Sequence, residues 1–169
     1  MSAIPILLAD AVTGVINTAV AADAFDQDFT AVRSYPIWTD DFEGLKDLSV
    51  DVVFVSSGGQ GALAELDSWQ TLETEPAVDI AIRKRFQTSD RDNRTNDVNV
   101  ASVDALVKLV EQIYETFAAD RMTAIELASG IHANWIDSTV RTYCDYDRLR
   151  QGIFVGVVRV RFVVSKAVT

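Results

Sequence analysis

The sequence predicts an α+β domain in which a mainly antiparallel β-sheet packs against two α-helices. Two segments have the apolar spacing of amphipathic helices, and several others are apolar throughout or alternate in the manner of strands. These segments follow one another as helix, three strands, helix, then one or two strands, which is typical of α+β folds. Because the chain has neither an internal repeat nor a linker, residues 1–169 are expected to form a single domain.

The first predicted element is a helix over residues 4–23. Ile4, Leu8 and Val12 begin an apolar stripe at helical spacing. Pro5 lies in the first turn, where a proline is tolerated because its missing N–H would have no partner within the helix. The pattern therefore predicts an amphipathic helix that buries one side.

Three strands are predicted in the middle of the chain. Residues 26–38 are rich in β-branched and aromatic side chains, residues 50–55 are almost wholly apolar, and residues 78–86 alternate between apolar and polar. An apolar strand such as the second is expected inside a sheet and not at its edge. The stretch 56–75, which begins SSGGQG, is interpreted as a long connection that could contain a short helical turn around Leu63 and Leu66, and the polar stretch 87–99 as a structureless loop.

The second helix gives the clearest helical pattern in the chain. Ser102 is the predicted N-cap, with Asp104 near the positive end of the helix dipole. An apolar stripe then continues at helical spacing as far as Phe117. One further strand is expected within residues 131–143.

The last segment, residues 145–164, begins with a polar turn and continues as a strand. Apolar side chains occupy every second position from Val158 to Val164, and Phe154 has the same parity. Arg159 and Arg161 have the opposite parity. Alternation of this kind predicts a strand with one buried face and one exposed, cationic face.

The composition excludes several classes of protein. A formal net charge of -10 argues against a dedicated nucleic-acid binder, because affinity for phosphates depends on lysine and arginine. The single cysteine excludes an internal disulfide and fits a reducing compartment. We find no signal-peptide pattern and no apolar run of the ~20 residues that a membrane helix needs. We therefore expect a protein made in a cytoplasm, with no membrane partner.

The sequence contains no pattern that predicts an enzyme. His132 is the only histidine and has no nucleophile near it in sequence, and the charges of Asp145 and Asp147 should raise the pKa of Cys144. The SSGGQG stretch lacks the lysine of a phosphate-binding loop. One histidine and one cysteine cannot complete a zinc site, and the acidic pairs lack the spacing of a calcium loop. We expect no catalytic residue, no cofactor and no metal.

The candidate functional residues are cations, which are notable in an acidic chain. Five lie within twelve positions, and two more lie in the last strand. Two interpretations are open. They form surface ion pairs with aspartates such as Asp90, each worth under ~1 kcal/mol, or they meet an acidic face of an identical or different partner. The second interpretation suits head-to-tail assembly into a ring. The proposed interface residues are Arg83, Lys84, Arg85, Arg91, Arg94, Arg159 and Arg161.

The order of the elements and three segments, residues 50–86, 102–117 and 145–164, resemble the tail terminator or tail-completion proteins of long-tailed bacteriophages, which share a fold with head–tail joining proteins. The resemblance is one of burial pattern and element order, without a chemical signature. Within the last segment, the positions that match the family pattern are Tyr146, Leu149, Phe154 and Phe162.

The resemblance implies a virion protein that forms a ring, usually a hexamer. Such a ring binds the end of the tail tube protein, stops its polymerisation and joins the tail to the head connector or neck protein, while DNA passes through the lumen. Two alternatives remain open. One is a neck or stopper protein of the same particle. The other is a cytoplasmic ligand-binding α+β protein or enzyme with its site in the SSGGQG connection.

Overall fold

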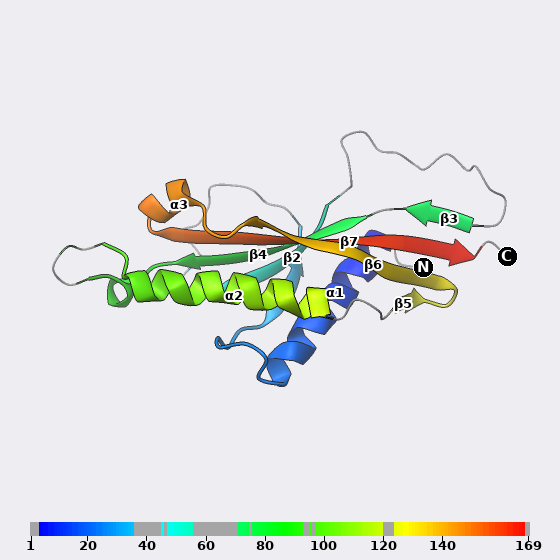
Figure 1. Ribbon diagram of the computed structural model, residues 1–169, viewed down its shortest axis with the longest axis horizontal. Coiled ribbons are helices and arrows are strands. Elements are labelled where there is room, and N and C mark those ends of the chain that lie inside the picture. Colours follow the sequence, from blue (N-terminus) through cyan, green and yellow to red (C-terminus); the bar gives the residue numbers. More distant parts are fainter. Residues whose placement is uncertain are drawn as a thin grey trace.

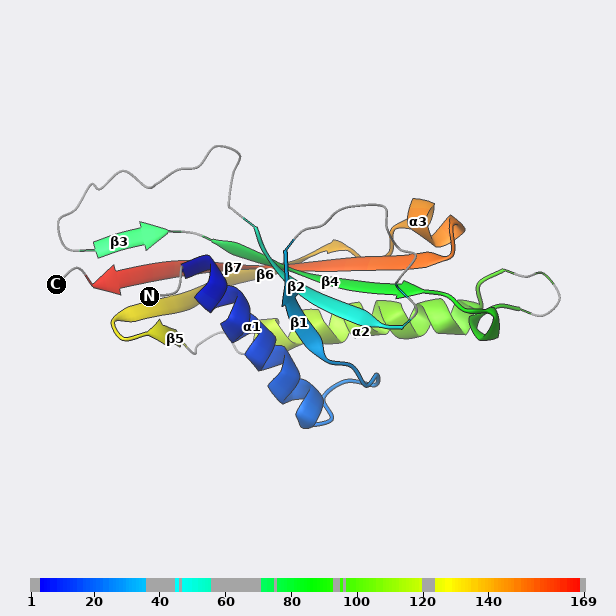
Figure 2. The same cartoon turned by 180° about the vertical axis from the view of Figure 1, so that it is seen from behind.

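The computed structural model shows one twisted β-sheet with two long helices, α1 (Ile4–Ala21) and α2 (Val100–Ala119), on the same side (Figure 1). From behind, α1 crosses the strands obliquely, whereas α2 runs nearly along them (Figure 2). The predicted α+β class is confirmed. The structure describes residues 4–35, 45, 47–55, 71–74, 76–92, 95, 97–119 and 124–167.

The strands are β1 (Ala31–Ser34), β2 (Ser49–Val55), β3 (Thr71–Thr74), β4 (Ala77–Arg85), β5 (Ile125–Ala128), β6 (Ile131–Thr142) and β7 (Ile153–Ala167). Six of them lie in the order β1-β2-β4-β7-β6-β5, and β3 pairs with β7. Every pair is antiparallel except β1 with β2, which run parallel. The apolar strand β2 lies between two others, as predicted.

Although it comes last in sequence, β7 is the centre of the sheet. On one side it pairs with β6, and on the other with β4 along residues 153–161 and with β3 along residues 164–167. β3 and β4 thus act as one long strand that is interrupted near Pro76. Proline has no N–H for the ladder, but the Pro76 carbonyl still accepts a hydrogen bond from the Phe162 N–H at 3.0 Å.

The core lies between the helices and one face of the sheet. Val78, Ile80 and Ile82 of β4 are fully buried, and the predicted inward residues of β7, from Phe154 to Val164, are at most 1 % exposed. The predicted parity of β7 is therefore confirmed. In β4 the residues of the opposite parity from Ala77 to Ala81 are buried as well, so its inward face is defined by its register with β7. The fully buried helix residues that meet the inward side chains are Leu8, Val12 and Ile16 of α1 and Leu109, Val110 and Ile113 of α2.

α2 comes unusually close to β7 at Gly156. A Cβ atom placed on this glycine would lie 2.5 Å from the Cγ2 atom of Val110 and 3.2 Å from the carbonyl oxygen of Tyr143. Real Cβ atoms do not approach other atoms so closely, so only glycine allows the helix to pack at this distance. This crossing fixes the position of α2 over the centre of the sheet.

The N-cap prediction for α2 is wrong by one turn. The helix begins at Val100, and the Oδ1 atom of Asn99 accepts a hydrogen bond from the Ala101 N–H at 2.9 Å. Asn99 is therefore the cap, and Ser102 lies in the first turn. Asparagine and serine are about equally good caps, so the choice depends on how far the loop before them is ordered.

That loop, residues 87–99, is more regular than predicted. It opens with a 3₁₀ turn at Thr88–Asp90, where the Asp90 carboxylate accepts a hydrogen bond from the Gln87 N–H at 2.8 Å. Arg91 and Val98 then pair as an isolated antiparallel bridge. The prediction of a structureless connection is wrong for its described residues, because aspartate side chains bind the backbone here where apolar contacts are scarce.

Three short elements were not predicted: β3, β5 and the helix α3 (Tyr146–Arg150). The carboxylate of Asp145 caps α3, accepting hydrogen bonds from the N–H groups of Asp147 and Arg148 at 3.0 and 3.1 Å. β5 joins β6 through a turn in which Gly130 has a positive φ of 74°. Elements of four or five residues are too short to show a period in sequence.

Within the described ranges, α1 is long and apolar enough to cross a membrane by length and composition alone. This differs from the sequence prediction, which found no segment of that kind. In the structure, however, Leu8, Val12 and Ile16 are completely buried against the sheet. These residues form one stripe, and the rest of the helix is only partly covered, so α1 packs as an amphipathic helix on the surface of the sheet.

Candidate assembly surface

The face of the sheet turned away from α1 and α2 (Figures 1 and 2) carries four of the predicted interface residues by register. Arg83 and Arg85 of β4 and Arg159 and Arg161 of β7 have the outward parity, opposite to that of the fully buried isoleucines of β4 and valines of β7. The sequence predicted this parity correctly. It could not show what stands beside each arginine on the neighbouring strands.

Two arginines of β7 form two-point ion pairs across the sheet. Arg159 stands opposite Asp79 of β4, and its Nε and Nη2 atoms donate to the two carboxylate oxygens, each at 2.7 Å. Arg161 stands opposite Asp137 of β6, with its Nε 2.8 Å from Oδ1 and its Nη2 bonded to Oδ2. Forked contacts of this kind hold both side chains in one orientation.

The third pair joins β4 to β2. The Nε and Nη2 atoms of Arg83 both donate to Oδ2 of Asp51, at 3.1 and 2.7 Å. The hydroxyl of Ser49 donates to the same oxygen at 2.7 Å. The three ion pairs together connect β2, β4, β7 and β6 across the outer face.

In the pairs that Arg83 and Arg159 form, the carboxylate is more deeply buried than the guanidinium group. The side chains of Asp51 and Asp79 are 12 and 8 % exposed, whereas those of their partners Arg83 and Arg159 are 26 and 25 % exposed. Although each pair is neutral, the charge that a partner would meet first is positive. Planar guanidinium groups also pack well against other side chains.

The pKa values reflect this pairing. The hydrogen bond to Asp79 raises the pKa of Arg159 above its ordinary value, and the hydrogen bond from Arg161 lowers the pKa of Asp137. Each pair favours the charged form of the group concerned. The outer face therefore keeps its alternating charges at neutral pH.

The structure separates two other predicted interface residues from this face. Lys84 has the inward parity and pairs with Asp90 at 3.2 Å, the aspartate that the ion-pair interpretation named. Arg91 lies at the bridge to Val98, beyond the end of β4, where Arg85 is exposed with the outward parity. Arg94 lies outside the described residues. The predicted cluster is thus not one patch in the structure.

The solvent-facing side of α2 is acidic. Asp104, Glu111 and Glu115 are exposed and recur at helical spacing. Lys108 lies on the same stripe, but its ammonium contacts the carboxylate of Asp26 at 2.5 Å, and this contact raises the pKa of Lys108. The sequence analysis missed this surface, although the polar positions between the apolar ones already carried the signal.

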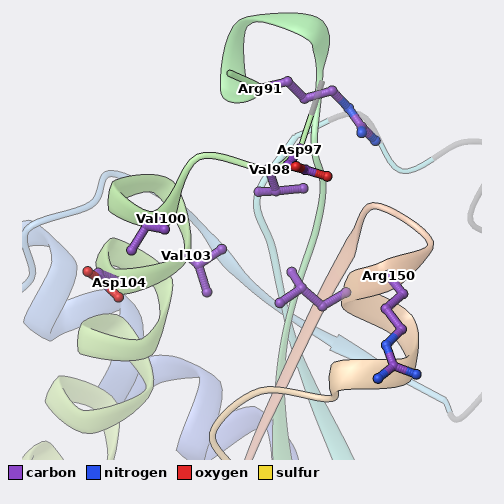
Figure 3. Close-up of a pocket in the computed structure, with 8 residues that line it drawn as sticks. Arg91, Asp97, Val98, Val100, Val103, Asp104 and Arg150 are labelled. Atoms are coloured by element: carbon purple, nitrogen blue, oxygen red, sulfur yellow. The ribbon is translucent and has the colours of Figure 1, made fainter. Parts of the chain in front are cut away.

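A cavity of about 330 Å³ opens at one end of the molecule, between the loop before α2, the start of α2 and α3 (Figure 3). Valine and leucine side chains line it together with two arginines and two aspartates. Its charges balance, and nothing in its lining assembles a nucleophile with a base. The lining residues are Arg91, Asp97, Val98, Val100, Val103, Asp104, Leu149 and Arg150.

The structure places two polar residues next to His132 that sequence order had hidden. In register, His132 of β6 stands between Glu126 of β5 and Ser165 of β7. A serine, a histidine and a carboxylate in a row are the parts of a nucleophilic site. His132 and Glu126 are exposed, and none of the hydrogen bonds of the described residues joins the three side chains. The row therefore lacks the connections that would orient and activate a serine.

The cysteine is also a poor nucleophile. Cys144 is partly buried against the core, and burial, followed by the charge of Asp145, raises the pKa of its thiol. The sequence predicted a buried or inert thiol and the contribution of Asp145, and in the structure burial makes the larger contribution. A protonated thiol is unreactive, because the thiolate is the attacking species.

The described part of the chain contains no group of three or more histidine, cysteine, aspartate or glutamate side chains arranged to hold a metal ion. The SSGGQG connection, where an alternative ligand site was expected, lies outside the described residues. What the geometry offers is an acidic surface on α2 and, on the opposite side of the sheet, a face of arginine–aspartate pairs in which the guanidinium groups are more exposed than the carboxylates.

Compared with known proteins, the sequence matches no family model and no curated protein. The resemblance to tail terminator proteins therefore depends on the residue pattern of this chain alone.

Proposed function

We propose that this protein is a virion structural subunit, a tail terminator of a long-tailed bacteriophage that assembles into a ring of six copies. The ring caps the tail tube, stops its polymerisation and joins the tail to the head connector. The observation that carries the proposal is the two-sided subunit. Helices with an acidic surface cover one side of the sheet, and the other side carries arginines.

A ring needs two dissimilar surfaces on each subunit, because every copy contacts its two neighbours through different patches. The arginine face and the acidic side of α2 are such a pair. The guanidinium groups of one surface are more exposed than their paired carboxylates and can meet the carboxylates of the other, which favours an ordered head-to-tail encounter over a face-to-face one. The net charge of -10 also suits a ring whose lumen DNA must pass through without binding.

The residues that carry the family resemblance have structural positions in keeping with this function. Phe154 and Phe162 are buried in the core, and Leu149 packs against it. Tyr146, in contrast, is 73 % exposed on α3. Large exposed aromatic side chains are enriched where proteins meet partners, so Tyr146 is a candidate contact to the tube or the connector.

Electron microscopy of phage particles assembled without this protein tests the proposal. A terminator predicts tails of abnormal length that carry no heads, because nothing stops the tube or joins it to the capsid. Tails of normal length beside heads that leak DNA would contradict this role and support the neck or stopper alternative.

A second measurement addresses the alternative from another class. The purified chain should bind to the ends of tail tubes and should not retain a small molecule. A chain that stays monomeric in the presence of tube ends and binds one small ligand tightly would contradict a structural function.

A further inference from the structure

We infer that the ring closes by docking the acidic stripe of α2 in one subunit onto the β6–β7 arginine surface of the next. The acidic stripe is Asp104, Glu111 and Glu115, and the β6–β7 arginine surface is Arg141, Arg159 and Arg161. The inference rests on the proposed function, because it names the partner of each ring surface as a second copy of this chain.

The β6–β7 arginine surface presents guanidinium groups at an accessible part of the sheet. Arg161 is 45 % exposed beside its partner Asp137, and Arg141 is exposed where the register of β6 shifts. Half-buried valines of β7, Val157 and Val163, share the outward parity with the arginines. A surface that combines apolar side chains with guanidinium groups is typical of protein interfaces.

The two surfaces match in length as well as in charge. From Asp104 to Glu115 the stripe covers eleven residues of helix, or roughly 16 Å at 1.5 Å per residue. On the sheet, Arg161 stands opposite Asp137, and Arg141 lies four residues further along β6, or roughly 13 Å at 3.3 Å per residue. A helix lying along β6 and β7 would bring its carboxylates within reach of all three arginines.

The two surfaces cannot meet within one chain. α2 lies on the side of the sheet that its apolar stripe covers (Figures 1 and 2). Its acidic stripe is exposed and, at helical spacing, lies opposite the buried residues. The arginines project from the opposite side. The contact must therefore form between copies, and a rotation of one sixth of a turn at each contact closes a ring of six.

The arginines remain suitable for docking although they are paired within the chain. Asp79 and Asp137 hold Arg159 and Arg161 in fixed orientations, so little side-chain freedom is lost on contact. Carboxylates from a neighbour add to these pairs without leaving a buried charge unpaired. We therefore expect the charges to set the orientation of the contact and to make assembly sensitive to salt.

Two charge-reversal variants test this inference. The first, Glu111→Lys with Glu115→Lys, reverses the acidic stripe, and the second, Arg141→Glu with Arg161→Glu, reverses the arginine surface. Thermal unfolding should show that both fold, since all four side chains are exposed. The control for the first variant is Asp28→Lys with Glu126→Lys, which makes the same change in net charge, +4, at exposed positions of neither surface; the second variant changes the net charge by the same amount in the opposite direction.

Sedimentation velocity of each variant, alone and mixed, gives the readout. Each reversal variant alone should shift the midpoint of ring assembly to at least about tenfold higher protein concentration, which corresponds to ~1.4 kcal/mol. An equal mixture of the two should assemble again, because each altered surface then meets its complement on the other variant. The control should assemble like the unaltered chain.

The possible results distinguish a failure of the docking from a failure of the proposed function. If both reversal variants assemble normally, or if their mixture fails to assemble although each is folded, the docking is wrong while the ring remains. If the unaltered chain forms no ring, either alone or on tail tube ends, the proposed function fails and the docking fails with it.

Discussion

The two faces of the sheet are made by the same strands but do different things. On the helix side of β7 every second residue is apolar and fully buried, whereas on the outer side Arg159 and Arg161 form ion pairs that solvent still reaches. Burial of the first set supplies most of the folding free energy, because transfer of apolar surface out of water is the dominant favourable contribution. Exposed ion pairs contribute little to stability, so the outer face is free to be used for recognition.

The largest expected effect comes from the helix side. Phe154→Ala removes a fully buried aromatic ring near the start of β7, the central strand, and should lower the free energy of unfolding by about 3–5 kcal/mol. Urea denaturation measures the change. Val32→Ala, at an exposed position of β1, is the control and should change the stability by under ~0.5 kcal/mol. Equal losses at the two positions would contradict the assignment of the core.

A smaller loss of stability should follow from adding a methyl group on the helix side of the sheet. Gly156→Ala places a methyl group 2.5 Å from the Val110 side chain, and the overpacking should cost about 1–3 kcal/mol. Adding Val110→Ala opens space for the new methyl, so the double variant should lose less than the two single losses combined. Simple additivity in a double-mutant cycle would show that α2 does not cross β7 at this glycine.

On the outer face, the pair of Asp79 and Arg159 should be worth less than the core contacts. Asp79→Ala leaves the guanidinium without its two-point partner and should cost about 1–2 kcal/mol, since Arg159 still reaches water. Replacing both residues by valine should recover part of this loss, because no charge is then left unpaired. If the double valine variant is less stable than Asp79→Ala, the ion pair stabilises the fold more than its exposure to water implies.

The smallest expected effect is on how the free energy of unfolding depends on pH. The pKa of Asp137 is lower in the folded chain than the ordinary value of 3.8, so its pair with Arg161 contributes to stability above that value. The contribution is lost as the pH falls through the lower, folded pKa. Asp137→Asn should therefore cost under ~1 kcal/mol at neutral pH and almost nothing near pH 2, as measured by urea denaturation. A loss that does not depend on pH would mean that the charge of Asp137 is not involved.

The difference between the two faces also explains how much the sequence could predict. The inward pattern of β4, β7 and both long helices was predictable, because burial imposes a period that a single segment displays, as from Val158 to Val164. The ion pairs were not, because Asp79 and Arg159 are 80 residues apart and meet only when β4 pairs with β7. Charge partners depend on register, and register is a property of two segments.

The assembly surface was predicted in part for the same reason. The outward parity of Arg159 and Arg161 was correct, but Lys84 has the inward parity and Arg91 lies at the cavity end of the molecule. A cluster in sequence becomes a patch in space only if its residues share a face, and the turn after β4 separates these. The acidic stripe of α2 could have been identified from the sequence by reading the polar positions of that helix as carefully as the apolar ones.

The most direct test of the account is the mass of the full-length chain in solution, alone and with tail tubes, measured by sedimentation velocity. The account predicts a ring of six copies of the 18.6 kDa chain, with a mass near ~110 kDa, that forms alone or on tube ends and dissociates as salt screens its charges. A chain that remains an 18.6 kDa monomer under both conditions would contradict it.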